Sequence, residues 1–151
     1  MEKYSYYYDS PFGRIYIAEL GGSISDVAFH PIPASVERKT PLVTRAAEML
    51  QEYFEGKRKA FDLPLDPKGT EFQKKAWDAL LTIPYGQTRS YKEQAEAVGN
   101  VKACRAVGAA NGKNPISIII PCHRVIGTDG SLVGFGGGLA LKKALLDLEK
   151  H

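Results

Sequence analysis

The chain has 151 residues, of which 44% are hydrophobic and 25% are charged, and its net charge is +3. This balance is ordinary for a folded globular protein and excludes an intrinsically disordered chain. The longest apolar run, around Ile118–Ile120, is far too short to span a bilayer, so we expect no membrane partner. The start, MEKYSYYYDSPFG, lacks the apolar core of a secretory signal, and two cysteines make no disulfide framework. We therefore expect a cytoplasmic protein.

Charge is distributed unevenly along the chain. Residues 1–67 carry 8 Lys or Arg and 10 Asp or Glu, whereas residues 68–151 carry 12 and 7. A basic second half is typical of proteins that bind an anionic partner such as nucleic acid. A solvated surface produces the same excess of basic residues, so charge alone does not decide between the two interpretations.

The first third of the chain predicts a small antiparallel sheet and one helix. Residues 4–9 and 14–19 flank the turn-forming sequence Ser10-Pro11-Phe12-Gly13, which predicts a β-hairpin. Residues 25–30 are a plausible third strand. Apolar side chains recur at helical spacing over residues 42–55, where we expect a helix.

A proline-bearing segment, residues 61–69, predicts a linker to a second lobe. We place an N-terminal α/β lobe at residues 1–66 and a C-terminal DNA-binding and active-site domain at residues 67–151. The predicted fold class is α/β (α+β), with a short antiparallel sheet and helix in the first lobe. The second lobe is expected to be mainly helical and to contain a helix-turn-helix.

The helix-turn-helix prediction depends on helix-capping signals. Thr70 opens a T-x-x-Q capping box and Ser90 opens an S-x-x-E capping box, so a helix should start after each. Gly99 ends the second of these helices, and Asn100 can cap the next, over residues 101–111. Two short helices joined by a tight turn are typical of DNA-binding proteins, in which the second helix meets the DNA. Such pairs also occur as plain packing units.

The helix predicted over residues 101–111 is rich in alanine, which gives it a thin profile suited to close approach to nucleic acid. Arg105 is the long cation among these small residues. The alternative role for Arg105 is a surface ion pair with Glu93 or Glu96.

Cys122 comes directly after a β-branched run. The run Ile116–Ile120, bounded by Pro115 and Pro121, predicts a buried strand or extended segment. Cysteine is among the most buried residue types, so one interpretation of Cys122 is a small hydrophobe that fills the core. The other interpretation is a reactive thiol at the end of the segment.

A thiol becomes a nucleophile when a nearby base or cation stabilises the thiolate. His123 is the nearest base, but adjacent residues of an extended chain point to opposite sides. Contact with Cys122 therefore requires a turn at Pro121 or a bridging water. A carboxylate usually fixes the tautomer of such a histidine, and the candidates near in sequence are Asp129, Asp147 and Glu149.

The glycine-rich stretch Gly134–Gly138 predicts a bare-backbone loop that can approach a ligand closely. It is no dinucleotide-binding fingerprint, because no βαβ unit surrounds it. A last helix is expected over residues 139–150, packing through Leu141, Leu145 and Leu148.

These motifs occur together in one order: S-Y-K-E-Q-A-E-A-V-G, K-A-C-R-A-V-G, N-P-I-S-I-I-I-P-C-H-R-V-I-G, G-F-G-G-G-L and L-L-D-L-E. The combination closely resembles the O6-alkylguanine-DNA alkyltransferases, over about Gly69 to Glu149. The resemblance extends more loosely to E-Y-F-E-G-K-R and F-D-L-P-L in the first lobe.

The resemblance implies a role for each matching catalytic residue. Cys122 matches the cysteine that accepts the alkyl group, and His123 matches the general base that acts on it through water. Glu149 matches the carboxylate that orients this histidine, and Asn114 matches an asparagine that braces the active-site turn. Tyr91 matches a tyrosine whose hydroxyl donates to the guanine ring as the base departs.

The resemblance also implies how DNA is held. Arg105 matches the arginine that enters the base stack when the damaged nucleotide is flipped out, and the alanine-rich helix docks in the minor groove. We expect DNA contacts from five residues, namely Cys104, Arg105, Ala106, Gly108 and Arg124. The substrate pocket is expected to include Val125, Phe135 and Gly136.

The expected function is DNA repair by direct, irreversible and single-turnover transfer of an alkyl group to Cys122, without a cofactor, on duplex DNA that contains O6-alkylguanine. We expect a monomer. Phe135 replaces a tyrosine of some relatives, and Cys104 stands where a small apolar residue is typical. Some relatives bind zinc through cysteines and histidines of the first lobe, which here has no cysteine and only His30, so no metal site is predicted.

Two other functions fit parts of the sequence. A non-catalytic helix-turn-helix lesion sensor or regulator would share the fold, but alkyltransferase-like sensors lack the acceptor cysteine that is present here. A Cys-His hydrolase would need a distant histidine, and only His30 and His151 are available. The acceptor cysteine therefore favours the repair protein.

Overall fold

The structure is a computed structural model that describes residues 1–132 and 138–150. Its contacts divide the chain into two compact units. The first holds residues 1–68 together with 115–119, and the second holds 69–114 and the described residues from 120 onward. The predicted domain boundary at 66/67 stays a prediction. Among the described helices, none is long and apolar enough to cross a membrane.

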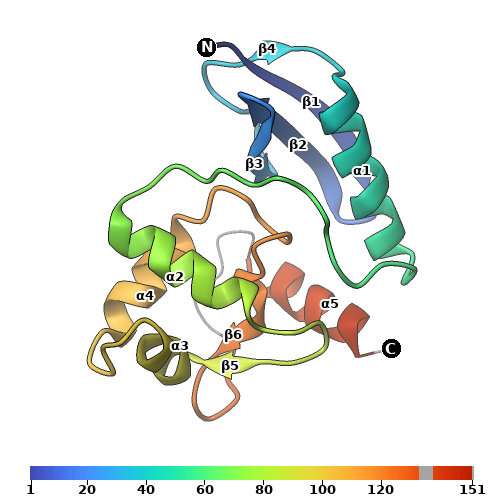
Figure 1. The fold of residues 1–151 in the computed structure, drawn as a ribbon. Coiled ribbons are helices and arrows are strands. Elements are labelled where there is room, and N and C mark those ends of the chain that lie inside the picture. The colour runs from blue at the N-terminus through green and yellow to red at the C-terminus, as the bar shows by residue number, and fades with distance from the viewer. Residues whose placement is uncertain (133–137, 151) are drawn as a thin grey trace. The chain divides into compact units, whose positions relative to one another are not determined.

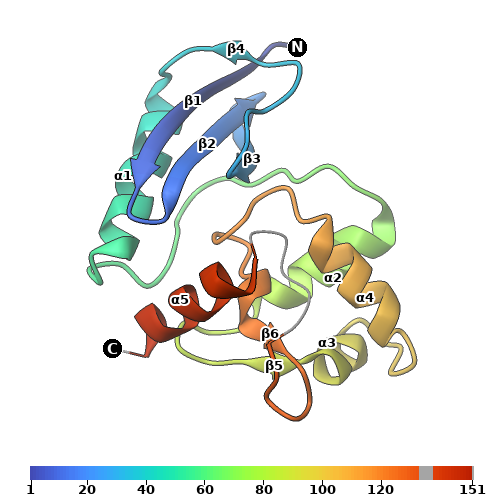
Figure 2. The same cartoon turned by 180° about the vertical axis from the view of Figure 1, so that it is seen from behind.

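The first unit is built on a four-stranded sheet in the order β3-β2-β1-β4 (Figures 1 and 2). Antiparallel pairing joins β1 to β2 and β2 to β3, whereas β4 runs parallel to β1. The predicted hairpin is confirmed, since Ser10 pairs with Gly13 at the turn. The bounds are β1 Lys3–Ser10, β2 Gly13–Leu20, β3 Ser23–Ala28 and β4 Val36–Glu37.

One helix, α1 (Pro41–Phe54), lies along this sheet (Figures 1 and 2). It starts there because the Thr40 side chain accepts a hydrogen bond from the backbone N–H of Val43, and proline is favoured in the first turn. The residues that α1 buries recur at helical spacing and form the core of the unit with Ile15, Ile17 and Val27 of the strands. They are Val43, Ala46, Met49, Leu50 and Tyr53.

Residues 115–119 complete the first unit but do not form the predicted strand. Only Ile116 pairs, with Val27 of β3. The Ile119 N–H donates to the Ser117 carbonyl at 2.8 Å, which closes a γ-turn around Ile118 with φ of 71°. A β-branched residue in this left-handed region is strained by about 1–3 kcal/mol, and its side chain is held because only 1% of it is exposed. The burial of the run was predicted correctly, and the extended conformation was wrong.

The second unit is mainly helical, as predicted. Both capping boxes are present, at Thr70 and Ser90, and each starts a helix at the predicted residue. The Trp77 indole N–H donates to the Ala110 carbonyl at 2.8 Å, which ties the first of these helices to the alanine-rich one. The helices are α2 Glu71–Leu81, α3 Tyr91–Ala97, α4 Cys104–Gly112 and α5 Leu139–Glu149.

The alanine-rich helix α4 begins three residues later than predicted. Asn100 does not cap it, because its side chain accepts from the Lys102 N–H at 3.0 Å and its carbonyl accepts from the Ala103 N–H at 2.9 Å. These bonds close a separate turn. The helix then starts at Cys104, with no side-chain cap at Ala103.

Three short elements of the second unit were not predicted. The strands β5 (Arg89–Ser90) and β6 (Val125–Ile126) pair in parallel. Between Pro121 and β6, the chain makes one 3-10 turn, η1 (Cys122–Arg124). The pairing brings the start of α3 beside the segment that follows Cys122.

Two glycine-to-alanine substitutions should change stability in opposite directions. At Gly69, an added Cβ would lie 2.5 Å from the Trp77 ring, so Gly69→Ala should destabilise the protein by about 1–3 kcal/mol. At Gly112, which is helical, nothing lies within 4 Å, so Gly112→Ala should stabilise by up to about 1 kcal/mol. Urea unfolding of both variants measures the difference. Shifts of the same sign would contradict the packing described for Trp77.

Candidate active site

Cys122 sits at the start of a tight turn rather than at the end of a strand. Pro121 has φ of −83° and ψ of 65°, and the Cys122 N–H donates to the Ile120 carbonyl at 2.8 Å. This is an inverse γ-turn, and the 3-10 turn η1 follows it directly. The chain therefore turns at Pro121. Such a turn is one of the two ways in which the side chains of Cys122 and His123 could interact, since in an extended chain they would point to opposite sides. All three residues of η1 are buried.

Asn114 holds this turn from the other side. Its side-chain N–H donates to the Ile120 carbonyl at 2.8 Å, and its backbone N–H donates to the Asn111 carbonyl at 3.2 Å, at the end of α4. The Asn114 side chain also hydrogen-bonds with the Cys122 thiol. One asparagine thus connects α4, the turn and the sulfur atom.

The thiol of Cys122 is protonated at rest. Burial raises its pKa above the ordinary value, whereas the hydrogen bond from Asn114 and the charge of Lys142 act in the opposite direction. Since the thiolate is the nucleophilic form, Cys122 needs a base to take its proton before it can attack.

The imidazole of His123, the next residue, has one ring nitrogen bonded to a carboxylate. Its Nε2 lies 2.6 Å from Glu149 Oε2. Since an ionised carboxylate only accepts, Nε2 carries the proton and Nδ1 presents its lone pair. Nδ1 is buried and has no hydrogen-bond partner among the described residues. Burial, with the charges of Arg124 and Lys142, lowers the pKa of His123 although Glu149 acts in the opposite direction, so the imidazole is neutral at physiological pH.

The Glu149 carboxylate is held in place by several donors. Arg124 donates to it through Nε at 2.8 Å and Nη2 at 3.1 Å, and the Gly86 N–H donates at 3.2 Å. The charge of Arg124 keeps the buried carboxylate ionised, and two bonds from one guanidinium fix its orientation.

The prediction that Arg124 binds DNA is wrong. Its residue surface is only 7% exposed, and its Nη1 donates to the Ile83 carbonyl at 2.7 Å while its other donors bind Glu149. A guanidinium with these donors engaged inside the protein cannot reach a phosphate. It instead holds the Glu149 carboxylate, which accepts a hydrogen bond from His123.

Tyr91 lies close to the thiol. It is the first residue of α3, and its pKa is raised mainly by burial and further by the thiolate form of Cys122. The hydroxyl therefore keeps its proton and remains a donor. A Cβ added at Gly108 would lie 3.7 Å from the Tyr91 ring, so the bare backbone of α4 packs against it. Gly108 is thus a packing residue, which the prediction of a DNA contact did not anticipate.

Lys142 is a site residue that the sequence analysis missed. Its side chain is fully buried, its Nζ donates to the Val125 carbonyl, and Nζ lies 5.9 Å from the centre of the Tyr91 ring. Its charge favours the Cys122 thiolate. Lys142 and Glu149 are seven residues apart in α5 and therefore share a face of the helix. The expectation that Glu149 points into the site could therefore have predicted that Lys142 does so too.

The other predicted DNA-contact residues of α4 differ in their exposure. Arg105 and Ala106 are exposed, and Cys104 is partly buried with its thiol 3.6 Å from the Val101 carbonyl. Within the described part of the chain, Arg105 makes no ion pair with Glu93 or Glu96, although that was the alternative role for it. The cation is therefore available to a partner.

The three predicted pocket residues have different outcomes. Val125 is fully buried, pairs with Arg89 in the β5–β6 ladder, and offers its carbonyl to Lys142. Its structural contribution to the site is therefore a backbone acceptor. Phe135 and Gly136 lie outside the described residues.

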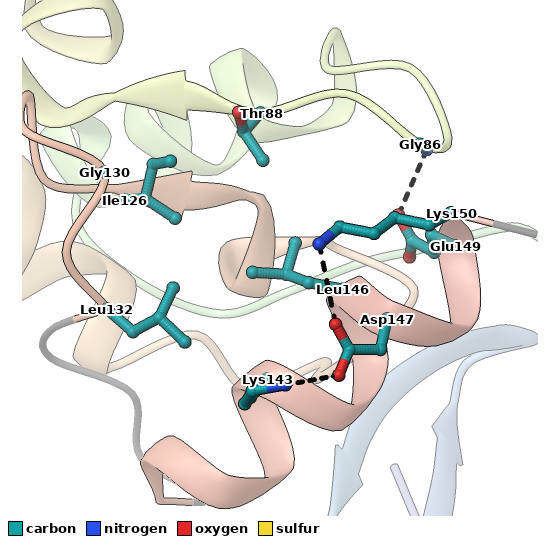
Figure 3. Close-up of a pocket in the computed structure, with 10 residues that line it drawn as sticks. All are labelled: Gly86, Thr88, Ile126, Gly130, Leu132, Lys143, Leu146, Asp147, Glu149 and Lys150. Atoms are coloured by element: carbon teal, nitrogen blue, oxygen red, sulfur yellow. Dashed lines mark hydrogen bonds and ion pairs between the residues drawn. The ribbon is translucent and has the colours of Figure 1, made fainter.

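A pocket of about 400 Å³ borders Glu149 (Figure 3). Apolar side chains of Ile126, Leu132 and Leu146 line it, and Lys143 and Lys150 both pair with Asp147 at its rim. Cys122 and Tyr91 are not among its lining residues. The pocket therefore borders the carboxylate and not the thiol.

Over residues 1–132 and 138–150, no group of three or more His, Cys, Asp and Glu side chains is arranged to hold a metal ion. The expectation of a protein without zinc stays a prediction.

Two family models together cover almost the whole chain. The model described as 6-O-methylguanine DNA methyltransferase, ribonuclease-like domain, matches residues 3–67, and the DNA binding domain of the same family matches residues 71–151. The chain belongs to the 6-O-methylguanine DNA methyltransferase family. The DNA-binding match covers every residue that was predicted to be catalytic.

Close relatives of this methyltransferase carry one name. The methylated-DNA–protein-cysteine methyltransferase of Methanosarcina barkeri is 48% identical over 96% of this chain and 98% of its own length. The protein of that name from Mycobacterium leprae is 49% identical over 95% of this chain and 90% of its own.

Solved structures give the same result for the fold. The O6-methylguanine methyltransferase of Mycobacterium tuberculosis has a TM-score of 0.91 and 45% identity, and the match covers 98% of this chain and 93% of the other. A structure of the M. tuberculosis protein in complex with DNA has a TM-score of 0.88 and 45% identity, over 99% and 93% of the two chains.

Replacing the buried lysine should raise the thiol pKa further. Lys142→Met removes a cation that favours the thiolate, so the pH profile of Cys122 alkylation should move to higher pH. Below the thiol pKa, the rate falls about tenfold for each unit by which that pKa rises, because the thiolate fraction falls with it. The measurement is the rate of iodoacetamide reaction at Cys122 against pH.

Lys143→Met is the matched control, because Lys143 is the next residue of α5 but is exposed and paired with Asp147. Its profile should coincide with that of the unmodified protein. Identical profiles for Lys142→Met and Lys143→Met would show that the buried cation does not act on the thiol.

Proposed function

We propose that this protein repairs DNA by moving the alkyl group of O6-alkylguanine in duplex DNA onto Sγ of Cys122. The observation that carries the proposal is the buried pair of a protonated thiol and, one residue later, a neutral histidine with an open Nδ1 lone pair. Family membership and relatives named for methyl transfer to a protein cysteine support the same reaction. The DNA-bound M. tuberculosis structure supports DNA as the partner.

The reaction begins with access to the base. An alkyl group on guanine O6 is hidden in the stacked duplex, so the nucleotide must be flipped out at a cost of a few kcal/mol. The exposed cation of Arg105 stands on the thin helix α4 and can fill the vacated stack. The basic second half of the chain offsets the repulsion between phosphates and protein.

The chemical step exchanges one bond for another. His123 takes the thiol proton at Nδ1, directly or through a water, while Glu149 accepts the hydrogen bond from Nε2 and stabilises the imidazolium. The thiolate attacks the alkyl carbon, so that a C–S bond forms as the C–O6 bond breaks. The departing guanine then needs a proton, and the Tyr91 hydroxyl, which keeps its proton because its pKa is raised, donates it.

The product is a thioether on Cys122, which has no easy hydrolytic route back to the thiol. We therefore infer that one molecule repairs one lesion. We expect the protein to act as a monomer and to associate with the nucleoid while it acts. A non-catalytic lesion sensor would bind the same DNA without gaining mass at Cys122.

Peptide mass analysis tests the acceptor. After incubation with an excess of duplex that carries O6-methylguanine, we expect one methyl group per chain, on Cys122 and not on Cys104. Cys104 is the internal control, because it lies on the DNA-contact helix but outside the hydrogen-bonded turn. An unmethylated Cys122, or equal labelling of the two cysteines, would overturn the proposal.

The flipping role of Arg105 predicts a difference between two substrates. Arg105→Ala should slow repair of duplex DNA by about tenfold or more, because no side chain then fills the gap that the flipped nucleotide leaves in the base stack. Reaction with free O6-methylguanine base should change by less than about twofold, since no stack is involved. Lys102→Ala, a neighbouring exposed cation, is the control for general charge loss. Equal slowing with both substrates would exclude the role.

A further inference from the structure

A reciprocal pair of side-chain amides joins α3 and α4 inside the second unit. Gln94 Nε2 donates to Asn111 Oδ1 at 2.8 Å, and Asn111 Nδ2 donates to Gln94 Oε1 at 2.8 Å. Gln94 Nε2 also donates to the Ala76 carbonyl of α2 at 3.1 Å. Both residues are buried, with 2% and 5% of their surface exposed. Gln94 therefore bonds α3 to both helices that pack against it.

The fully buried part of the core around this pair is made mostly of alanine, with the larger Phe72 and Tyr91 packed at its edge. Its buried members are Ala76, Ala95, Ala103, Val107 and Ala110. Small apolar side chains interdigitate little, and apolar contact has no direction, so this packing specifies the axial position of α4 only weakly. Amide hydrogen bonds are directional, and a displaced α4 would leave buried amides unpaired, which is strongly unfavourable. Together with the bond from the Trp77 indole N–H to the Ala110 carbonyl, the pair therefore fixes the register that the alanines leave loose.

The register of α4 decides where three parts of the site lie. Arg105 is on the exposed side of the helix, and Gly108 faces the Tyr91 ring. At the end of the helix, the Asn111 carbonyl accepts from the N–H of Asn114. An axial shift of one turn would move Arg105 by about 5.4 Å relative to the rest of the unit.

We propose that Gln94 and Asn111 are positioning residues that hold α4 in the one register in which Arg105 and Cys122 act on the same nucleotide. The proposal rests on the functions proposed above for Arg105 and Cys122. Neither amide touches the substrate; both act through α4. Asn114 is also held by the Ile120 carbonyl, so the thiol keeps part of its support without the pair. Removing the pair should therefore impair repair in duplex DNA far more than reaction with the free base.

The test replaces both amides with apolar side chains of similar total size, in the double variant Gln94→Met/Asn111→Ala. No buried amide is then left unpaired, so the variant folds with little loss of Tm. We expect repair of methylated duplex to slow by about tenfold or more, and reaction with free O6-methylguanine to stay within about twofold. A 2-aminopurine reporter beside the lesion should show a weaker flipping signal.

The matched control is Val107→Ala, which makes a cavity in the same helix interface but keeps the amide pair. It should lower Tm and leave both rates, measured well below Tm, unchanged. Equal slowing on duplex and free base in the double variant, or an unchanged duplex rate, would overturn the positioning role. A native protein that fails to methylate Cys122 would instead refute the proposed function.

Discussion

The active site depends on one buried carboxylate. Glu149 accepts hydrogen bonds from His123, from Arg124 and from the backbone of Gly86, and so joins the end of α5 to the cysteine turn and to the loop before α3. A buried anion is tolerated only when it is paired and fully hydrogen-bonded, and here the pairing also determines which histidine nitrogen carries the proton. The same face of α5 brings Lys142 toward the thiol.

The electrostatics keep the acceptor inactive until substrate arrives. A buried, protonated thiol is a poor nucleophile toward solvent-borne electrophiles, and a neutral histidine costs less to bury than a charged one. Lys142 and Asn114 lower the thiol pKa from its raised value, so proton transfer to His123 becomes less unfavourable. Because each protein molecule reacts only once, a side reaction of its thiol with another alkyl donor would inactivate that molecule.

Elements governed by local signals could be predicted from the sequence, and contacts between distant residues could not. Thr70 and Ser90 stand beside the residues they cap, so both helix starts were predicted correctly. Arg124 was assigned to DNA because its partner, Glu149, is 25 residues away. The run before Cys122 was predicted to be a strand or extended segment because an apolar pattern does not distinguish extended backbone from a buried turn. Its conformation depends on pairing with Val27, far earlier in the chain.

That same pairing affects the order in which the protein can fold. The Val27 N–H donates to the Pro115 carbonyl, and the Val27 carbonyl accepts from the Ser117 N–H. This edge of β3 is therefore completed by residues that are synthesised late. A nascent chain of 68 residues already contains the whole sheet and α1, yet it lacks the isoleucines that finish its core. The first unit can therefore be completed only after residues 115–119, which follow α4, have been synthesised.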